Sequence, residues 1–244
     1  MIKNWITPAG EIYIPYADML KQSHLLIAGA SGSGKSTLIN GLIYSALYAP
    51  PNEKQLILID PKRVELNQYK QLPHTLKHAT ETPDIINTLY QSINIMENRY
   101  LIMQERGDKQ YTGSNIYIIV DEFADLMTTA KKETIPLLCR LSQLGRAANI
   151  HLILATQRPT KDIITGQIKV NLISRIALHV ATPQDSRNII DIKGAEKLPL
   201  YGYGIYNTPQ GTQVIKIIKT EDNEITRIIN HWTQQNINKW RLFK

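Results

Sequence analysis

The feature that most constrains the fold is a glycine-rich segment between an apolar run and a helical pattern. Residues 29–36 read G-A-S-G-S-G-K-S, which matches the phosphate-binding pattern G-x-x-x-x-G-K-[ST]. The run HLLIA comes before it, and LINGLIYSAL follows with helical spacing. A strand, a glycine-rich turn and a helix in this order predict an α/β fold with a mostly parallel central sheet flanked by helices.

The glycine-rich segment indicates a nucleotide triphosphate site. Its glycines let the backbone curl around phosphate oxygens, and the N–H groups that open the next helix point at the anion. We expect Lys35 to place positive charge at the β- and γ-phosphates and Ser36 to offer a hydroxyl to Mg²⁺. ATP and Mg²⁺ are therefore the expected cofactors; the alternative is a strand-to-helix turn that binds no nucleotide. The predicted cradle consists of Gly29, Ala30, Ser31, Gly32, Ser33, Gly34, Lys35, Ser36 and Thr37.

Two further apolar runs end in polar residues. Residues 116–122 read IYIIVDE, and carboxylates at the end of a parallel strand lie in the crevice where ligands bind. We assign Asp121 to Mg²⁺, through its water shell, and Glu122 to polarising the attacking water; the alternative is a strand end followed by a helix cap. The run IHLILAT at 150–156 precedes Gln157, our candidate γ-phosphate sensor, whose amide could instead bind loop backbone.

Composition adds limits rather than a function. The 244 residues carry a net charge of +7 with one cysteine, so an internal disulfide and a cysteine-based zinc site are excluded and a polyanion partner is favoured. Neither a signal peptide nor a membrane-length apolar run is present, which predicts a cytoplasmic protein. We expect one domain over 1–244, divided into a lead-in at 1–23, a core at 24–206 and a C-terminal strand and helix at 207–244.

Several segments outside the phosphate site resemble a known family. They are QLILIDPKRVELNQYKQLPHTL at 55–76, VDEFADLM at 120–127, LGRAANIHLILATQRP at 144–159, DIITGQIKVNLISRIALHV at 162–180 and DSRNIIDIKGAEKL at 185–198. In order and spacing they resemble the FtsK/SpoIIIE family of DNA translocases. The resemblance implies a RecA-like sheet with an added strand between the P-loop strand and the Asp-Glu strand. It also implies a hexameric ring around double-stranded DNA, with ATP between subunits.

The resemblance also implies roles for four basic residues. Arg146 matches an arginine that contacts the γ-phosphate of a neighbouring subunit, and its alternative is a surface arginine at a helix end. Arg158, Lys169 and Arg187 match residues on pore-facing loops that contact DNA phosphates, and their alternative is solvated loop charge. The chain departs from the family at residues 181–184, where ATPQ lacks a frequent lysine, and at 201–204, where Tyr-Gly-Tyr-Gly replaces Gly-Arg-Gly-Asp.

Three functions are compatible with this pattern. The first is an ATPase that moves double-stranded DNA during transfer, segregation or packaging of a plasmid, mobile element or viral genome. The second is a related ATPase that energises protein secretion, and the third is a P-loop regulator without a motor function. The intact catalytic residues argue against the third, and the basic charge favours the first. The chain has no room for a DNA-reading winged-helix domain, so we expect a stripped-down motor. A membrane or transfer complex is a candidate partner, without direct insertion into the membrane.

Overall fold

The structure is a computed structural model that describes residues 5–6 and 12–241, with side chains from 12 to 234. Parts of the predicted lead-in (1–4 and 7–11) and the last three residues lie outside it. A central sheet has the strand order β10-β9-β8-β3-β7-β6-β4-β5. Its strands are β3 His24–Ala28, β4 Lys54–Ile59, β5 Thr75–Ala79, β6 Asn115–Val120, β7 Ile150–Thr156, β8 Ser174–Leu178, β9 Tyr203–Thr208 and β10 Gly211–Lys216. Two short strands, β1 Trp5–Ile6 and β2 Ile12–Tyr13, pair separately.

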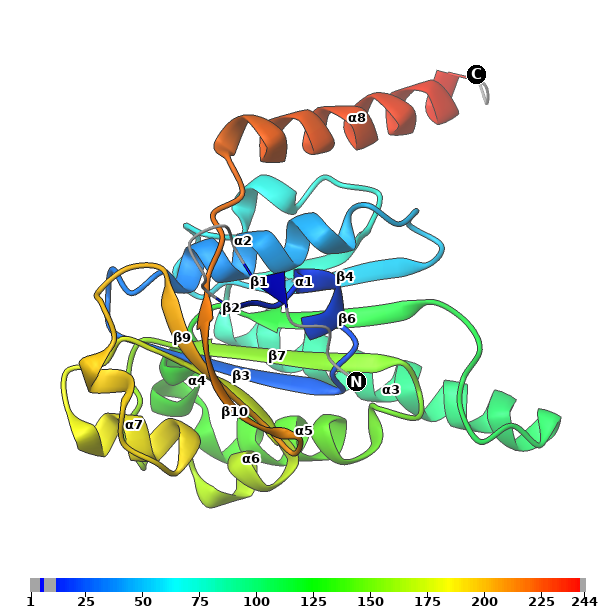
Figure 1. The fold of residues 1–244 in the computed structure, drawn as a ribbon. Coiled ribbons are helices and arrows are strands. Elements are labelled where there is room, and N and C mark those ends of the chain that lie inside the picture. The colour runs from blue at the N-terminus through cyan, green and yellow to red at the C-terminus, as the bar shows by residue number, and fades with distance from the viewer. Residues whose placement is uncertain (1–4, 7–11, 242–244) are drawn as a thin grey trace.

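The strands β8, β3, β7, β6, β4 and β5 run parallel to one another. At the other side of the sheet, β9 and β10 form an antiparallel hairpin, with β9 antiparallel to β8. Both faces of the sheet are covered by helices (Figure 1). These are α1 Tyr16–Met19, α2 Lys35–Ala46, α3 Thr82–Arg106, α4 Phe123–Thr129, α5 Lys131–Leu144, α6 Gly166–Asn171, α7 Pro183–Ile190 and α8 Asp222–Arg241. Every residue of β3 and β7 is buried, as expected for parallel strands whose runs are continuously apolar.

The core has two parts, one on each face of the sheet. One cluster joins the sheet to α3, α4, α5, α6 and α7 through residues such as Leu89 and Leu138. The other joins it to α1, α2 and the start of α8 through residues such as Leu42 and Ile225. In α3 and α5 the apolar residues that recur every three to four positions lie on the helix side that packs against the first cluster. Their periodicity therefore reflects core packing.

The predicted mostly parallel sheet is confirmed, and its details refine two expectations. The strands β4 and β5, which come between β3 and β6 in the chain, lie beyond β6 at the edge; in space β7 separates β3 from β6. The expected boundary at residue 206 falls inside β9, whose six residues pair with both β8 and β10. The C-terminal segment therefore continues the same sheet.

Candidate functional site

The P-loop connects β3 to α2 and depends on its glycines. Gly32 and Gly34 have φ angles of +77° and +99°, a region that residues with side chains rarely adopt. A Cβ on Gly29 would lie 2.6 Å from Cβ of Leu178. The loop is also fixed by backbone bonds, because Ala30 N donates to His179 O at 2.8 Å beyond the end of β8. The sequence motif thus forms a closely held turn at the carboxyl end of the sheet.

Lys35 opens α2 and points at the end of β6. Its side chain is only 3% exposed, and its ammonium forms an ion pair with the Asp121 carboxylate and donates to the Asp121 backbone carbonyl at 3.0 Å. Burial raises the pKa of Asp121 above its ordinary value, while the positive charge of Lys35 opposes the rise. A buried charge is costly unless it is paired, so this pair holds both groups in place at the loop.

Glu122, directly after Asp121, is enclosed by groups from neighbouring strands. It is fully buried and accepts hydrogen bonds from Thr156 Oγ1 at 2.5 Å and from the backbone N–H of Gln157 at 3.0 Å. Lys62 Nζ lies 3.3 Å from its Oε2. Because β4, β6 and β7 are neighbours and parallel, the residues that follow them meet at the carboxyl end of the sheet. The carboxylate is therefore held in one orientation.

Sequence reasoning did not assign Lys62 and Thr156 to the site. Lys62 lies in the family-like Asp-Pro-Lys-Arg segment, and its contact with Glu122 depends on β4 lying beside β6. Thr156 is a polar residue at a strand end, with no motif that marks it. Gln157 meets Glu122 through its backbone N–H, a contact that residue type does not predict.

The donor atoms present fit Mg²⁺ rather than a softer metal. Within the described residues, no group of three or more His, Cys, Asp or Glu side chains could hold a metal by itself. Mg²⁺ is usually bound through one or two protein oxygens, with waters and phosphate oxygens completing the shell. Ser36 in the first turn of α2 and the buried Asp121 offer such oxygens. Ser33 Oγ, in the same loop, is buried without a hydrogen-bond partner.

Arg146 lies at the opposite end of the sheet from the P-loop. It is exposed in the turn between α5 and β7. The residue before it, Gly145, lies beside His24, the first residue of β3, because a Cβ on Gly145 would be 3.2 Å from Cε1 of His24. Burial lowers the pKa of His24 to about 4, and positive charge on His151 and Arg146 adds to the effect. Five strand residues of about 3.3 Å each place roughly 16 Å between this end and Gly29. Arg146 therefore does not reach the P-loop of its own chain.

Of the three candidate DNA contacts, Arg158 directly follows the carboxyl end of β7, whereas Lys169 and Arg187 lie on helices. Arg158 is 58% exposed in the loop after β7 and lies 3.5 Å from Asp125. Lys169 of α6 and Arg187 of α7 line the same groove of about 460 Å³, together with Lys161 and Asp191. The structure thus brings two of the three together, and Arg158 stands apart from the groove's lining.

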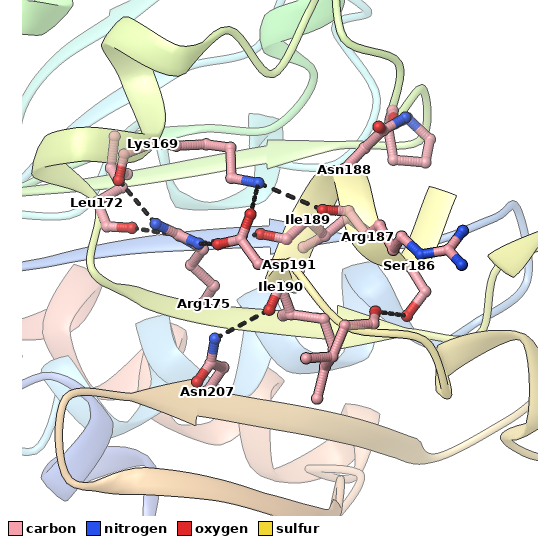
Figure 2. A network of polar contacts seen from close by, with 12 residues as sticks. Lys169, Leu172, Arg175, Ser186, Arg187, Asn188, Ile189, Ile190, Asp191 and Asn207 are labelled. Carbon is pink, nitrogen blue, oxygen red and sulfur yellow. Dashed lines mark hydrogen bonds and ion pairs between the residues drawn. The ribbon is translucent and has the colours of Figure 1, made fainter. Parts of the chain in front are cut away.

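Lys169 belongs to an ion-pair network (Figure 2). Its Nζ lies 2.5 Å from Asp191 and donates to the carbonyl of Arg187 at 3.3 Å, and it is only 17% exposed. Arg175 contacts the other Asp191 oxygen at 2.5 Å. Burial alone would raise the pKa of Asp191, but the hydrogen bonds from Lys169 and Arg175 outweigh it and hold that pKa below its ordinary value. Lys169 is therefore a partly neutralised cation, which sequence could not reveal.

The loop, its lysine and the carboxylates at the ends of parallel strands define the P-loop ATPase class of fold. The sequence profile of the FtsK/SpoIIIE family matches residues 9–115 and 110–161. The chain belongs to this family. It is 40% identical over 238 residues to the DNA translocase SpoIIIE of Bacillus subtilis strain 168, covering 88% of this chain and 30% of that protein. The chain thus spans less than a third of that relative.

Solved structures with the same fold come from different systems. The pCW3 conjugation coupling protein TcpA, solved with ATPγS, superposes with a TM-score of 0.79 at 22% identity, covering 94% of this chain and 70% of that chain. The type VII secretion ATPase EccC of Thermomonospora curvata superposes with a TM-score of 0.73 at 22% identity, covering 87% and 28%. At such identities the likeness establishes the fold alone.

None of the helices in the described part of the chain combines the length and hydrophobicity that a membrane crossing requires.

Proposed function

We propose that the chain is an ATP-hydrolysing motor that moves double-stranded DNA through a ring of its own copies. The main support is the buried arrangement of Lys35, Asp121 and Glu122 at the carboxyl end of the sheet. The chain is also 40% identical to a DNA translocase. A P-loop regulator without turnover would not require a fully buried glutamate that is oriented from three sides.

The site residues have separable roles in hydrolysis. Lys35 exchanges its partner Asp121 for the β- and γ-phosphates, where its charge offsets the charge of the transferring group. Glu122, oriented by Thr156 and the Gln157 backbone, accepts a hydrogen bond from the attacking water and polarises it. Ser36 and Asp121 would hold Mg²⁺, which supplies charge neutralisation at the phosphates when it is bound.

A neighbouring copy would complete this site. Arg146 projects from the end of the sheet opposite its own P-loop, so it can serve the P-loop of the next subunit in a head-to-tail ring. A guanidinium there would stabilise charge on the γ-phosphate. The side chain of Gln157, at the edge beside Glu122, is the proposed sensor of that phosphate. A hexamer is the ring size that we propose, with ATP at each boundary.

Three basic residues outside the catalytic site would meet DNA. Arg158 directly follows β7, whose end carries Thr156 and Gln157 beside Glu122, whereas Lys169 and Arg187 line the groove between α6 and α7. Contacts to phosphates give affinity and position without reading base sequence. We therefore propose that all three face the pore and that the motor acts on DNA of any sequence.

Duplex DNA is expected to raise the ATPase rate of the assembled protein regardless of base sequence. Replacing Arg158, Lys169 and Arg187 together with alanine should weaken DNA binding and remove most of this stimulation, while the basal rate persists. Each lost phosphate contact should also flatten the salt dependence by about 0.9 log unit of affinity per log unit of salt. Fluorescence anisotropy over a salt series, with ATPase assays in parallel, measures all three effects.

A matched control removes charge from a distant surface. Arg106 and Lys109, both exposed near the end of α3, can be replaced with alanine, which should leave the salt slope unchanged. Equal salt slopes in the triple variant and the wild type would contradict the assigned DNA contacts. Failure of any DNA to bind the assembled wild-type ring would instead favour a polypeptide cargo, the second candidate, because a secretion ATPase shares this fold.

A further inference from the structure

An exposed aromatic ring stands directly beside the P-loop. Tyr201, in the turn before β9, is 68% exposed, yet its Cε1 atom is 3.5 Å from the point where a side chain on Gly32 would begin. A Cβ at Gly32 would be in ordinary van der Waals contact with the ring, so the ring lies directly beside the loop. An exposed aromatic ring within reach of a phosphate site is available to a ligand.

The turn that carries Tyr201 is held firmly in place. Gly202 has a φ angle of +74°, and its carbonyl accepts a hydrogen bond from Ile217 N at 2.8 Å. The backbone N of Gly202 lies 3.7 Å from the Cβ position of Gly34, so the turn contacts the P-loop at two glycines. Tyr16 Oη also donates to the carbonyl of Ile218, which fixes the segment that follows β10. The ring is thus presented from a rigid support.

The order of the strands determines which part of a nucleotide would meet Tyr201. The P-loop strand β3 lies between β7 and β8. Asp121 and Glu122 follow β6, beyond β7, whereas Tyr201 precedes β9, beyond β8. A nucleoside triphosphate that directs its γ-phosphate toward Glu122 extends its sugar and base in the opposite direction across the P-loop. That direction leads to the turn containing Tyr201.

We propose that Tyr201 is the stacking surface for the nucleobase of the bound nucleotide. The inference rests on the proposed ATP site and identifies how that site holds the non-reacting end of its substrate. Leu200, the residue before Tyr201, is also exposed, at 42%, and adds apolar surface to the same turn. Stacking depends on the π-face that every base has, so the ring adds affinity for nucleoside triphosphates without selecting one base.

Nucleotide binding by the assembled full chain tests the proposal. By calorimetry with Mg²⁺, Tyr201→Ala is expected to weaken ATP binding about 5- to 100-fold, the range that base–aromatic stacking gives, and GTP binding by a similar factor. Tyr201→Phe keeps the ring and should bind as the wild type does. Inorganic tripolyphosphate, which has no base, should bind wild type and Tyr201→Ala equally.

The controls separate this proposal from the proposed function. Lys35→Ala should weaken binding of ATP and tripolyphosphate alike, because it acts on the phosphates. If Tyr201→Ala binds ATP as tightly as wild type, or loses tripolyphosphate to the same extent as ATP, the stacking role is overturned while the ATP site stands. If the wild type binds neither ATP nor tripolyphosphate, the proposed function fails and the stacking role fails with it.

Discussion

Glu122→Gln is expected to lower the rate of ATP hydrolysis about 100- to 10,000-fold, the range typical of a general base, while ATP binding persists. Glutamine has the size of glutamate and retains one oxygen for the hydrogen bonds from Thr156 Oγ1 and Gln157 N. It cannot accept the proton of the attacking water. Single-turnover hydrolysis and ATP binding, measured on the same purified protein, separate the chemical step from binding.

The matched control for this variant is Glu133→Gln, an exposed glutamate in the first turn of α5, which should hydrolyse ATP as the wild type does. Circular dichroism should show both variants folded, since neither change alters packing volume. Wild-type turnover by Glu122→Gln would remove the role assigned to this residue and leave the buried carboxylate as a purely structural group.

The second large effect is expected at Arg146. Arg146→Ala should bind ATP normally yet hydrolyse it about 1,000-fold more slowly or worse, as when other arginines that act across a boundary are lost. Mixing it with Lys35→Ala should restore part of the activity, because a mixed boundary can pair an intact P-loop with an intact arginine. ATP turnover measured over a range of mixing ratios would show this recovery.

The same chain supplies the control for the mixing experiment. A double variant with both Lys35→Ala and Arg146→Ala has neither the P-loop lysine nor the arginine. Mixing it with Arg146→Ala should therefore restore no ATPase activity. Arg146→Lys should restore little, because an ammonium cannot present the planar donor pair of a guanidinium. Absence of recovery at every ratio with Lys35→Ala would contradict action across a subunit boundary.

Local sequence patterns were sufficient for the centre of the sheet. The runs at 116–120 and 150–156 predicted β6 and β7, which the structure has as Asn115–Val120 and Ile150–Thr156. Their ends were predictable because buried parallel strands are apolar throughout and stop at polar residues. The P-loop was equally clear, since the positive φ angles of Gly32 and Gly34 require the glycines that the motif displays.

Contacts between residues that are far apart in the chain could not be predicted from the sequence, because they depend on which strands and turns are neighbours. Lys62 reaches Glu122 only because β4 lies beside β6, and 60 residues separate the two in the chain. Lys169 is predicted on a pore-facing loop or as a solvated loop charge, but it lies in α6, is only 17% exposed and is paired with Asp191. The ring of Tyr201 lies against Gly32 because the turn before β9 returns to the P-loop. Each contact arises from tertiary packing, for which residue spacing carries no signal.

Displacement of a triplex-forming strand measures movement along DNA. A labelled third strand is bound to a duplex at some distance from one end, and the assembled protein is added with ATP and Mg²⁺. We predict ATP-dependent release of the third strand by the wild type and none by Glu122→Gln. Release should not depend on the duplex sequence that leads to the triplex. Retention of the third strand by wild-type rings that bind the duplex and hydrolyse ATP would contradict translocation.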